Sequence, residues 1–509
     1  MLVKIILLLL FFGCMIGVGL YARKSTSSTN DFVLGGRNVG PWLSAFAYGT
    51  SYFSAVVFVG YAGQFGWKYG LASTWIGLGN AVLGSLLAWV AMGRRTRVMT
   101  HHLEVATMPD FFGKRYDSNV IKITASVIAF VFLIPYTASV YNGLSRLFGM
   151  AFDIPYTACV VTMALLTGVY VILGGYMATA INDFIQGIIM LVGIVAVIGA
   201  VLSGQGGFLE AVRKLSEIPS DVPVTMGQQG AFASFFGTDP LNLLGVIILT
   251  SLGTWGLPQM VHKFYAIKSE RAIKTGTIVS TFFAVIVSGG CYFLGGFGRL
   301  FDSEALYKAD GTVLYDAVVP TMLATLPDIL IGIVIVLVLS ASMSTLSSLV
   351  LTSASTLTLD FLKGNLVKDM DDKKQLIYIR VLIVFFIVLS VVLALNPPTF
   401  IAQLMGISWG ALAGAFLAPF LYGLYWKGVT KAGVWASFIC GVGITVSNMF
   451  LKFIASPINA GAVAMIAGLI VTPLVSLVTP KLENQFLGKI FMCYDNTVNV
   501  SKKEYLKED

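Results

Sequence analysis

Six hydroxyl side chains lie within one short apolar segment, which is a pattern suited to holding a cation at membrane depth. They are Ser340, Ser342, Ser344, Thr345, Ser347 and Ser348. The stretch 329–351 has no charged residue and is long enough to cross a bilayer as a helix. Within it, Ala341, Ser344, Thr345 and Ser348 share one helix face. Neutral oxygens suit a hard, weakly held cation such as Na⁺. Small hydroxyl residues that let helices pack closely explain the same pattern.

An acidic residue beside an apolar run is the second chemical signal, because charge inside a membrane is costly and usually functional. Asp183 follows Asn182 where such a run begins. Two interpretations stay open from position alone. The carboxylate supplies negative charge to a cation site, or it starts a helix near the water interface, where the helix dipole favours an acid.

The composition is that of a polytopic membrane protein. Of the 509 residues, 57% are hydrophobic and 11% charged, and the mean hydropathy is +0.84. A soluble protein carries about a quarter charged residues. The 53 glycines fit close helix packing, and the five cysteines have no metal or redox spacing. The net charge of +8 reports membrane topology, so no nucleic-acid partner is expected.

Hydropathy predicts an all-α fold of about thirteen transmembrane helices in a single transporter domain over 1–480, followed by a short tail over 481–509. The first apolar run is of full spanning length and is followed by Arg23 and Lys24, which favours a retained helix over a signal peptide. The predicted spans lie near 2–22, 42–63, 71–93, 119–147, 155–173, 183–204, 240–262, 273–298, 325–350, 376–395, 400–425, 432–453 and 460–479.

The distribution of basic residues predicts the orientation of these spans. With the N-terminus outside, roughly three quarters of the Lys and Arg residues fall in cytoplasmic links, as the positive-inside rule requires. An odd number of spans then places the C-terminus in the cytoplasm. We therefore expect a multi-pass protein of the cell (plasma) membrane.

Two spans carry residues that interrupt a helix. Residues 47–55 are small, polar and aromatic, and residues 250–259 include two glycines and a proline. Breaks five spans apart predict two five-helix halves, about 42–204 and 240–425, in which unwound backbone exposes carbonyls and helix ends. An ordinary kink explains either break alone. We expect the solute cavity to be lined by Ser51, Tyr52, Ser54, Tyr136 and Trp255.

Enzyme signatures are missing from the sequence. It has no P-loop, no paired metal-ligand spacing and only three histidines. We therefore expect no enzyme, no catalytic residue and no cofactor. Transport must then draw on an ion gradient, and the expected partners are a small solute, Na⁺ and the lipid bilayer.

Taken together, these residues resemble the sodium:solute symporter family over nearly the whole chain. The resemblance rests on four segments. They are the linker after the first span (33–42), a Gly-Gly followed by Asn-Asp and Gln-Gly (174–187), the end of span seven (258–264) and the hydroxyl-rich helix (340–348). It implies a LeuT-type five-plus-five inverted repeat and Na⁺-coupled symport by alternating access.

The same resemblance implies the ion ligands. A first sodium site would use the backbone carbonyls of Thr50, Phe53 and Ala341 with the hydroxyls of Ser344 and Thr345. Some family members hold a second sodium ion. Here its site would use Asp183, Ser344, Ser347 and Ser348, so both one and two ions per cycle stay open.

The solute is predicted only by class. Tyr52 stands where the proline carriers have an acidic residue and Thr250 where they have a tryptophan, whereas Tyr136 matches their tyrosine. We expect a monocarboxylate, an amino acid such as proline, or a pantothenate-like acid. The alternatives are a Na⁺-coupled sugar or sialic acid carrier and a transporter-like membrane sensor, although the tail is too short for a signalling domain.

Overall fold

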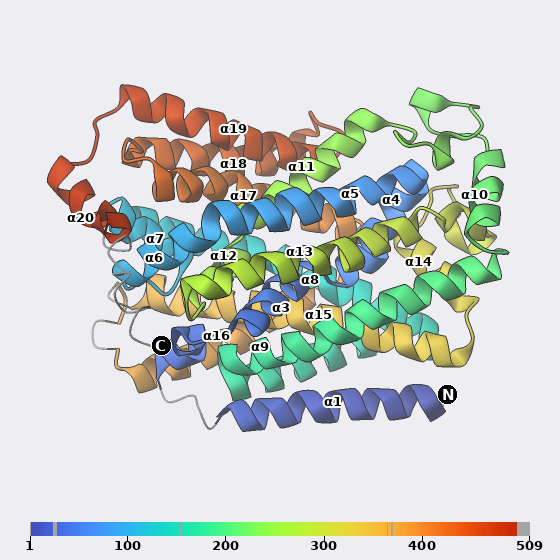
Figure 1. Cartoon of the computed structure of the whole chain (residues 1–509), viewed down its shortest axis with the longest axis horizontal. Coiled ribbons are helices and arrows are strands. Elements are labelled where there is room, and N and C mark those ends of the chain that lie inside the picture. Colours follow the sequence, from blue (N-terminus) through green and yellow to red (C-terminus); the bar gives the residue numbers. More distant parts are fainter. Residues whose placement is uncertain (1, 24–27, 153, 364, 368–369, 496–509) are drawn as a thin grey trace, which may run out of the picture.

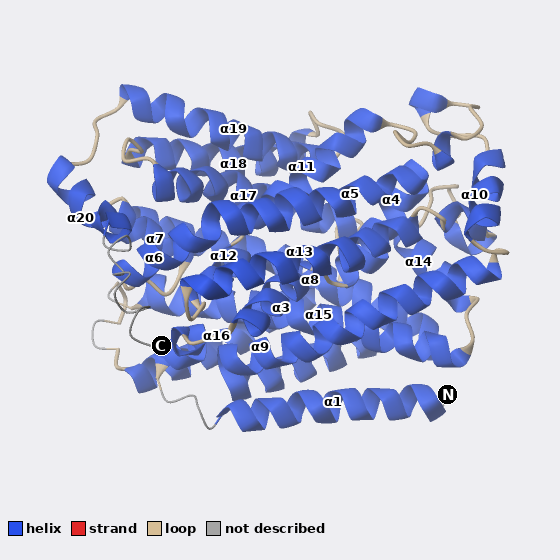
Figure 2. Cartoon of the chain, in the orientation of Figure 1, coloured by secondary structure: helices blue, strands red, loops and turns tan. Residues whose placement is uncertain are grey.

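The computed structural model describes residues 2–23, 28–152, 154–363, 365–367 and 370–495. The regular structure in these ranges is entirely helical (Figure 2). The long helices run between two ends of the bundle (Figure 1). One end carries α6 (Arg94–His102), α7 (Met108–Arg115) and α20 (Asn484–Asp495), and the other carries α10 (Phe208–Glu217) and α14 (Tyr315–Ala324). Helix α1 (Leu2–Arg23) lies on the outside of the bundle and starts at the α10 end, opposite α20.

The remaining long helices differ in how deeply they are buried. In the most apolar part of Asp328–Leu362, 78% of the residues are buried, and in Ile401–Tyr425 94% are. The corresponding values for Lys4–Ala22 and Asp372–Leu395 are 22% and 28%, so these helices form the rim. The bounds are α8 (Asn119–Phe152), α9 (Tyr156–Gly204), α13 (Glu270–Gly295), α15 (Asp328–Thr356) with η10 (Leu357–Leu362), α16 (Asp372–Leu395), α17 (Ile401–Tyr425), α18 (Lys431–Leu451) and α19 (Pro457–Val478).

Ten helices in the described ranges are long and apolar enough to cross a membrane, or eleven if a bent pair is counted as one span. The exact count of thirteen stays a prediction. Two features account for the difference between eleven spans and the predicted thirteen. The helical residues from Val56 to His102 follow one another without a loop, and the segment Tyr156–Val169 is short of spanning length.

The predicted interruption near residues 47–55 is confirmed. Helix α3 (Pro41–Tyr52) begins with a proline, which suits the first helical position. It ends where Phe53 adopts an extended backbone, with φ −94° and ψ 126°. The chain returns to helix in η2 (Val56–Tyr61) and continues as α4 (Ala62–Tyr69). Backbone groups between the two helical parts are therefore free of the regular helix ladder.

The predicted break in the seventh span is also present. Helices α11 (Pro240–Gly256) and α12 (Pro258–Tyr265) meet at an angle of 45°. The residue between them, Leu257, is extended, with φ −82° and ψ 122°. Pro258 contributes to the break, because proline has no N–H and disfavours a helical conformation in the residue before it. The two breaks thus have nearly the same backbone conformation, as two related halves would.

A third interruption divides α9 at Gly175. This residue has φ 56° and ψ −151°, a conformation that is essentially restricted to glycine. A Cβ atom there would also lie 2.7 Å from the carbonyl oxygen of Phe32 in α2 (Thr29–Leu34). The break separates the predicted spans 155–173 and 183–204, and it orients the part of α9 that carries Asp183.

Replacing Gly175 by alanine should therefore lower the thermal stability of the purified protein. The strained backbone alone costs roughly 1–3 kcal/mol, so the apparent melting temperature in detergent should fall by several degrees. Gly199→Ala in the same helix is the matched control, because no atom lies within 4 Å of its added Cβ. Equal melting temperatures for the two variants would show that the break does not constrain the fold.

Candidate ion and solute site

The hydroxyl of Thr345 joins α15 to the broken end of α3. Its Oγ1 lies 3.0 Å from the carbonyl oxygen of Phe53 and 3.2 Å from that of Ala341. The carbonyl oxygen of Ser51 is 3.3 Å away. Three carbonyls from two separate segments therefore converge on one side chain. The extended backbone at Phe53 is what turns the α3 carbonyls toward α15.

Ser344 makes a second link to α3, one helix position before Thr345. Its hydroxyl donates to Oγ1 of Thr50 at 2.7 Å. The carbonyl of Thr50 accepts a hydrogen bond from the N–H of Phe53 at 3.2 Å. The structure therefore brings all five predicted residues of the first sodium site together. It adds the carbonyl of Ser51, for which the sequence offered only the general signal of an interrupted helix.

The donor set of this group fits a sodium ion. Every converging atom is a neutral oxygen, and hard cations prefer carbonyl and hydroxyl oxygens. Phe53, Ser344 and Thr345 are each at most 1% exposed, so an ion bound here would exchange its water shell for protein oxygens.

The residues predicted for a second sodium site come from two helices: Ser347 and Ser348 lie about one turn after Ser344 on α15, and Asp183 lies on α9. Asp183 is fully buried within α9, which does not fit the alternative of a helix-start acid near water. Ser347 donates to the carbonyl of Ser344 at 2.9 Å. The hydroxyl of Ser348 lies 2.9 Å from that of Ser51, so Ser51 faces the hydroxyl-rich helix.

Lys263 also belongs to this second group. Counting basic residues places it in a cytoplasmic link, but the structure buries it on α12 with 2% exposure. Its Nζ donates to Oγ of Ser348 at 2.9 Å and lies 3.6 Å from Oδ2 of Asp183. The sequence feature that could have predicted this burial is the position of Lys263, five residues after Pro258. A helix that restarts at the break carries Lys263 back into the bundle.

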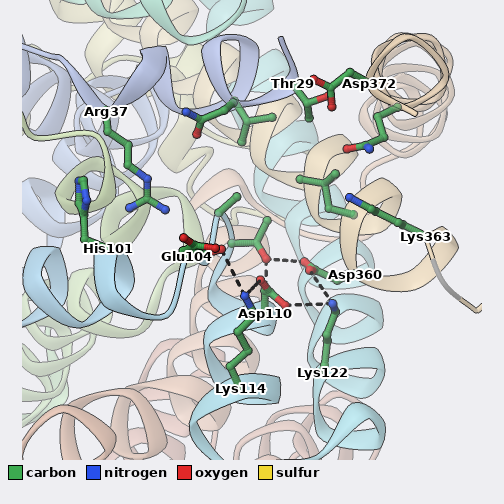
Figure 3. A pocket seen from close by; sticks show the side chains of 16 residues that line it. Thr29, Arg37, His101, Glu104, Asp110, Lys114, Lys122, Asp360, Lys363 and Asp372 are labelled. Carbon is green, nitrogen blue, oxygen red and sulfur yellow. Dashed lines mark hydrogen bonds and ion pairs between the residues drawn. The ribbon is translucent and has the colours of Figure 1, made fainter. Parts of the chain in front are cut away.

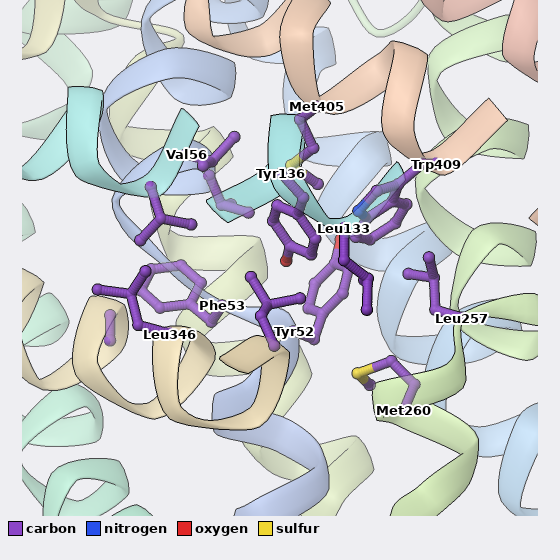
Figure 4. Close-up of a cluster of buried hydrophobic side chains, with 14 of the residues drawn as sticks. Tyr52, Phe53, Val56, Leu133, Tyr136, Leu257, Met260, Leu346, Met405 and Trp409 are labelled. Carbon is purple, nitrogen blue, oxygen red and sulfur yellow. The ribbon is translucent and has the colours of Figure 1, made fainter. Parts of the chain in front are cut away.

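An aromatic cluster lies beside the first group of oxygens. The ring of Trp409 in α17 is 5.8 Å from that of Tyr52 in α3 and 5.8 Å from that of Tyr136 in α8. Figure 4 shows these three side chains turned toward one another. All three are buried, as are Tyr61 and Tyr292.

Polar atoms of this aromatic cluster are left without hydrogen-bond partners. In the described part of the chain, the four tyrosine hydroxyls and the indole N–H of Trp409 are buried with no partner. An unpaired buried donor costs about 1–3 kcal/mol. Several such donors in one place are chemically suited to a hydrogen-bonding solute.

The predicted solute-lining residues therefore divide into two sets. Tyr52 and Tyr136 are in the aromatic cluster. Trp255 is not: its N–H donates at 2.8 Å to the carbonyl of Leu83 in η4 (Asn80–Leu87). Ser54 accepts a bond from the nearby N–H of Val56 at 3.2 Å. The sequence did not lead to a prediction for Trp409. The feature that could have pointed to it is a lone tryptophan between two glycines in an apolar span.

A charged cavity of about 800 Å³ opens at the α6 and α7 end of the bundle. Figure 3 shows Lys122 between Asp110 and Asp360. Its Nζ is 2.9 Å from Asp110 and 3.8 Å from Asp360. Asp360 also accepts a hydrogen bond from Thr107 at 2.6 Å. This network fastens η10, the continuation of the hydroxyl-rich helix, to α7 and α8.

Two further cavities open at the other end, near α10 and α14. The larger is about 570 Å³ and includes Gln64, Lys68 and Asp239 in its lining. The smaller is about 360 Å³ and contains Asp316, where burial raises the pKa of the carboxyl group to about 6. The buried oxygen groups and the aromatic cluster lie among the helices between these ends.

A bundle of apolar helices, two matched breaks and a buried group of converging oxygens are features of an ion-coupled secondary transporter. The family model described as the sodium:solute symporter family matches residues 32–441. The protein belongs to this family, and its activity class is Na⁺-coupled solute symport.

Known proteins with similar sequences and folds agree with this assignment. Sodium/proline symporters of Staphylococcus aureus strains JH9 and USA300 are 30% identical over 504 residues, covering 94% of this chain and 93% of theirs. The solved structure of a Na⁺-coupled sialic acid symporter aligns with TM-score 0.76 at 16% identity, covering 94% of this chain and 98% of that one. Mhp1, a nucleobase-cation-symport-1 family transporter, aligns with TM-score 0.52 at 13% identity, covering 90% and 97%. The predicted LeuT-type fold is thereby confirmed.

Removing the hydroxyl of Thr345 should weaken sodium binding. Thr345→Val keeps the shape of the side chain but loses the oxygen. A hydrogen-bond or ion contact of this kind is worth about 1.5–3 kcal/mol, so the Na⁺ concentration giving half-maximal thermal stabilisation should rise roughly 10- to 100-fold. Thr345→Ser should stay close to the wild type.

Thr358→Val is the matched control for this substitution, because the hydroxyl of Thr358 bonds only to the carbonyl of Ala354 in its own helical segment. An unchanged sodium requirement in Thr345→Val would exclude this residue from the ion site.

Proposed function

We propose that the protein carries a small organic solute bearing a carboxylate, together with Na⁺, by alternating access. The observation that carries the proposal is the convergence of the Phe53, Ala341 and Ser51 carbonyls on the Thr345 hydroxyl. An ion held there binds α3 and α15 at once. The same break in α3 presents Tyr52 to the aromatic cluster, so the ion and the solute share one structural element.

Coupling follows from that shared element. A sodium ion that orders the extended backbone at Phe53 also fixes the orientation of Tyr52, one residue earlier. Solute binding that fixes Tyr52 must in turn raise the affinity for Na⁺ by the same factor, because coupling free energies are reciprocal. The ion gradient then drives the solute, with about 2.3 kcal/mol from each charge that moves down 100 mV.

The unpaired donors of the aromatic cluster support the solute class. Tyrosine hydroxyls and an indole N–H suit a carboxylate, and the ring faces suit a compact apolar body. The break in α3 also directs a helix end toward the region. A monocarboxylate, an amino acid such as proline, or a pantothenate-like acid meets these requirements. The similarity to sodium/proline symporters supports the amino acid, and a sugar or sialic acid carrier is the alternative.

We further propose the orientation and organisation of the chain in the membrane. The α10 and α14 end faces outward and the α6 and α7 end, rich in basic residues, faces the cytoplasm, in the cell membrane. Residues 1–480 form one transport domain with repeats over about 42–204 and 240–425, and 481–509 form a cytoplasmic tail. The protein works as a carrier without enzymatic turnover or a cofactor, and not as a sensor.

The proposal is tested by screening solutes for Na⁺-dependent thermal stabilisation of the purified protein. We expect proline, lactate or pantothenate to stabilise it in NaCl and to have little effect in choline chloride. Hits are then tested for uptake into proteoliposomes with an imposed sodium gradient. Stabilisation by glucose or sialic acid alone would favour the alternative, and uptake that follows a proton gradient instead of sodium would overturn the proposal.

Removing single donors from the aromatic cluster should weaken solute binding and leave sodium binding nearly unchanged. Tyr136→Phe and Trp409→Phe each delete one donor but keep an aromatic ring. The concentration of the stabilising solute at half-effect should rise about 3- to 30-fold, which corresponds to a hydrogen bond of roughly 0.7–2 kcal/mol. Tyr307→Phe is the control, since its hydroxyl bonds only to Asp302 in an exposed loop. Variants that bind solute like the wild type would place the solute elsewhere.

A further inference from the structure

Lys263 lies at the position predicted for the second sodium ion. Its ammonium group donates to Ser348 at 2.9 Å and faces Asp183 at 3.6 Å. The ring of Tyr176 lies 5.1 Å from the same nitrogen, which adds a cation–π contact. Lys263 is 2% exposed and Asp183 is fully buried. The lysine thus has the surroundings of a bound cation: a carboxylate, a hydroxyl and an aromatic face.

The serine residues of this second group are already engaged in other contacts. Ser347 donates to the carbonyl of Ser344, and Ser344 donates to Thr50. Ser348 contacts both Lys263 and Ser51. Oδ2 of Asp183 lies 3.6 Å from Nζ of Lys263, so the charge of this carboxylate is balanced by the ion pair with the lysine.

Charge balance opposes a sodium ion beside this lysine. Asp183 and Lys263 together are neutral, so an added ion would leave one unbalanced positive charge in a buried place. An ion at a normal contact distance from Oγ of Ser348 would lie at most about 5 Å from the ammonium nitrogen. At an effective dielectric constant of about 20, repulsion at that distance weakens binding on the order of a hundredfold.

We propose that the ammonium group of Lys263 is a tethered cation that takes the place of a second sodium ion at Asp183, Ser347 and Ser348. The protein therefore binds one Na⁺ per chain, at Thr345. This inference rests on the proposed function of the Thr345 site. Lys263 also joins α12, just beyond the second helix break, to α9 and α15, and it contributes a fixed charge where other carriers of this architecture take up a mobile one.

The test measures equilibrium binding of ²²Na⁺ to the purified full-length protein without added solute. The wild type should bind one ion per chain. Lys263→Met removes the charge at nearly constant length, and this variant should bind two. Lys263→Arg, which keeps the charge, should bind one. In the Lys263→Met background, Asp183→Asn should return the number to one. Lys268→Met, at an exposed position in the following loop, should behave as the wild type.

Two results would overturn the assignment: two ions bound by the wild type, or one ion bound by folded Lys263→Met. The wild-type count decides the question even if the lysine variants do not fold. Thr345→Val separates this inference from the proposed function. It should lower the affinity of the single site roughly 10- to 100-fold in the wild-type background and leave one ion bound with unchanged affinity in the Lys263→Met background. No sodium binding by the wild type would overturn the Thr345 site itself and this inference with it.

Discussion

The structure depends on one constraint: a helix that stops at Tyr52 must still satisfy the backbone groups it releases. Inside a membrane, water is not available to do so, and irregular backbone is tolerated only where protein or a bound ion supplies partners. The hydroxyl-rich face of α15 supplies them, through Thr345 at the carbonyls of Ser51 and Phe53 and through Ser342 at the N–H of Ala55. The same need makes the break suitable for a cation, because carbonyl oxygens are good ligands for a hard ion.

The second helix break has nearly the same backbone geometry as the first, but the residue associated with it is a lysine. Leu257 has nearly the backbone angles of Phe53. The helix beyond it carries Lys263 into the bundle, where it meets Asp183 of α9 and Ser348 of α15. Each break therefore brings either the lysine charge or a candidate cation site to α15. This accounts for a helix that is among the most buried and is still rich in hydroxyl groups.

The local parts of this arrangement were predictable from the sequence. Hydroxyl residues at helix spacing in an uncharged span pointed to Ser344 and Thr345. Small, polar and aromatic residues marked the first break, and two glycines and a proline marked the second. The remainder depends on contacts between distant helices. Hydropathy falls at Lys263 and therefore places it in a link between spans. No neighbouring residue in the sequence shows that α12 turns into the bundle. Trp409 joins Tyr52 and Tyr136 from three separate helices, so no spacing along the chain reveals the cluster. The number of spans stays a prediction because helices that follow one another without a loop cannot be divided into spans by hydropathy alone.

Sodium binding at Thr345 should order the broken part of α3. Hydrogen exchange measured with and without Na⁺, at constant ionic strength maintained with choline chloride, tests it directly. Na⁺ should slow exchange together in residues 50–57 and 341–348, with one half-saturation concentration for both segments, while α18 and α19 are unaffected. Protection confined to one of the two segments, or no protection by sodium in either, would contradict it.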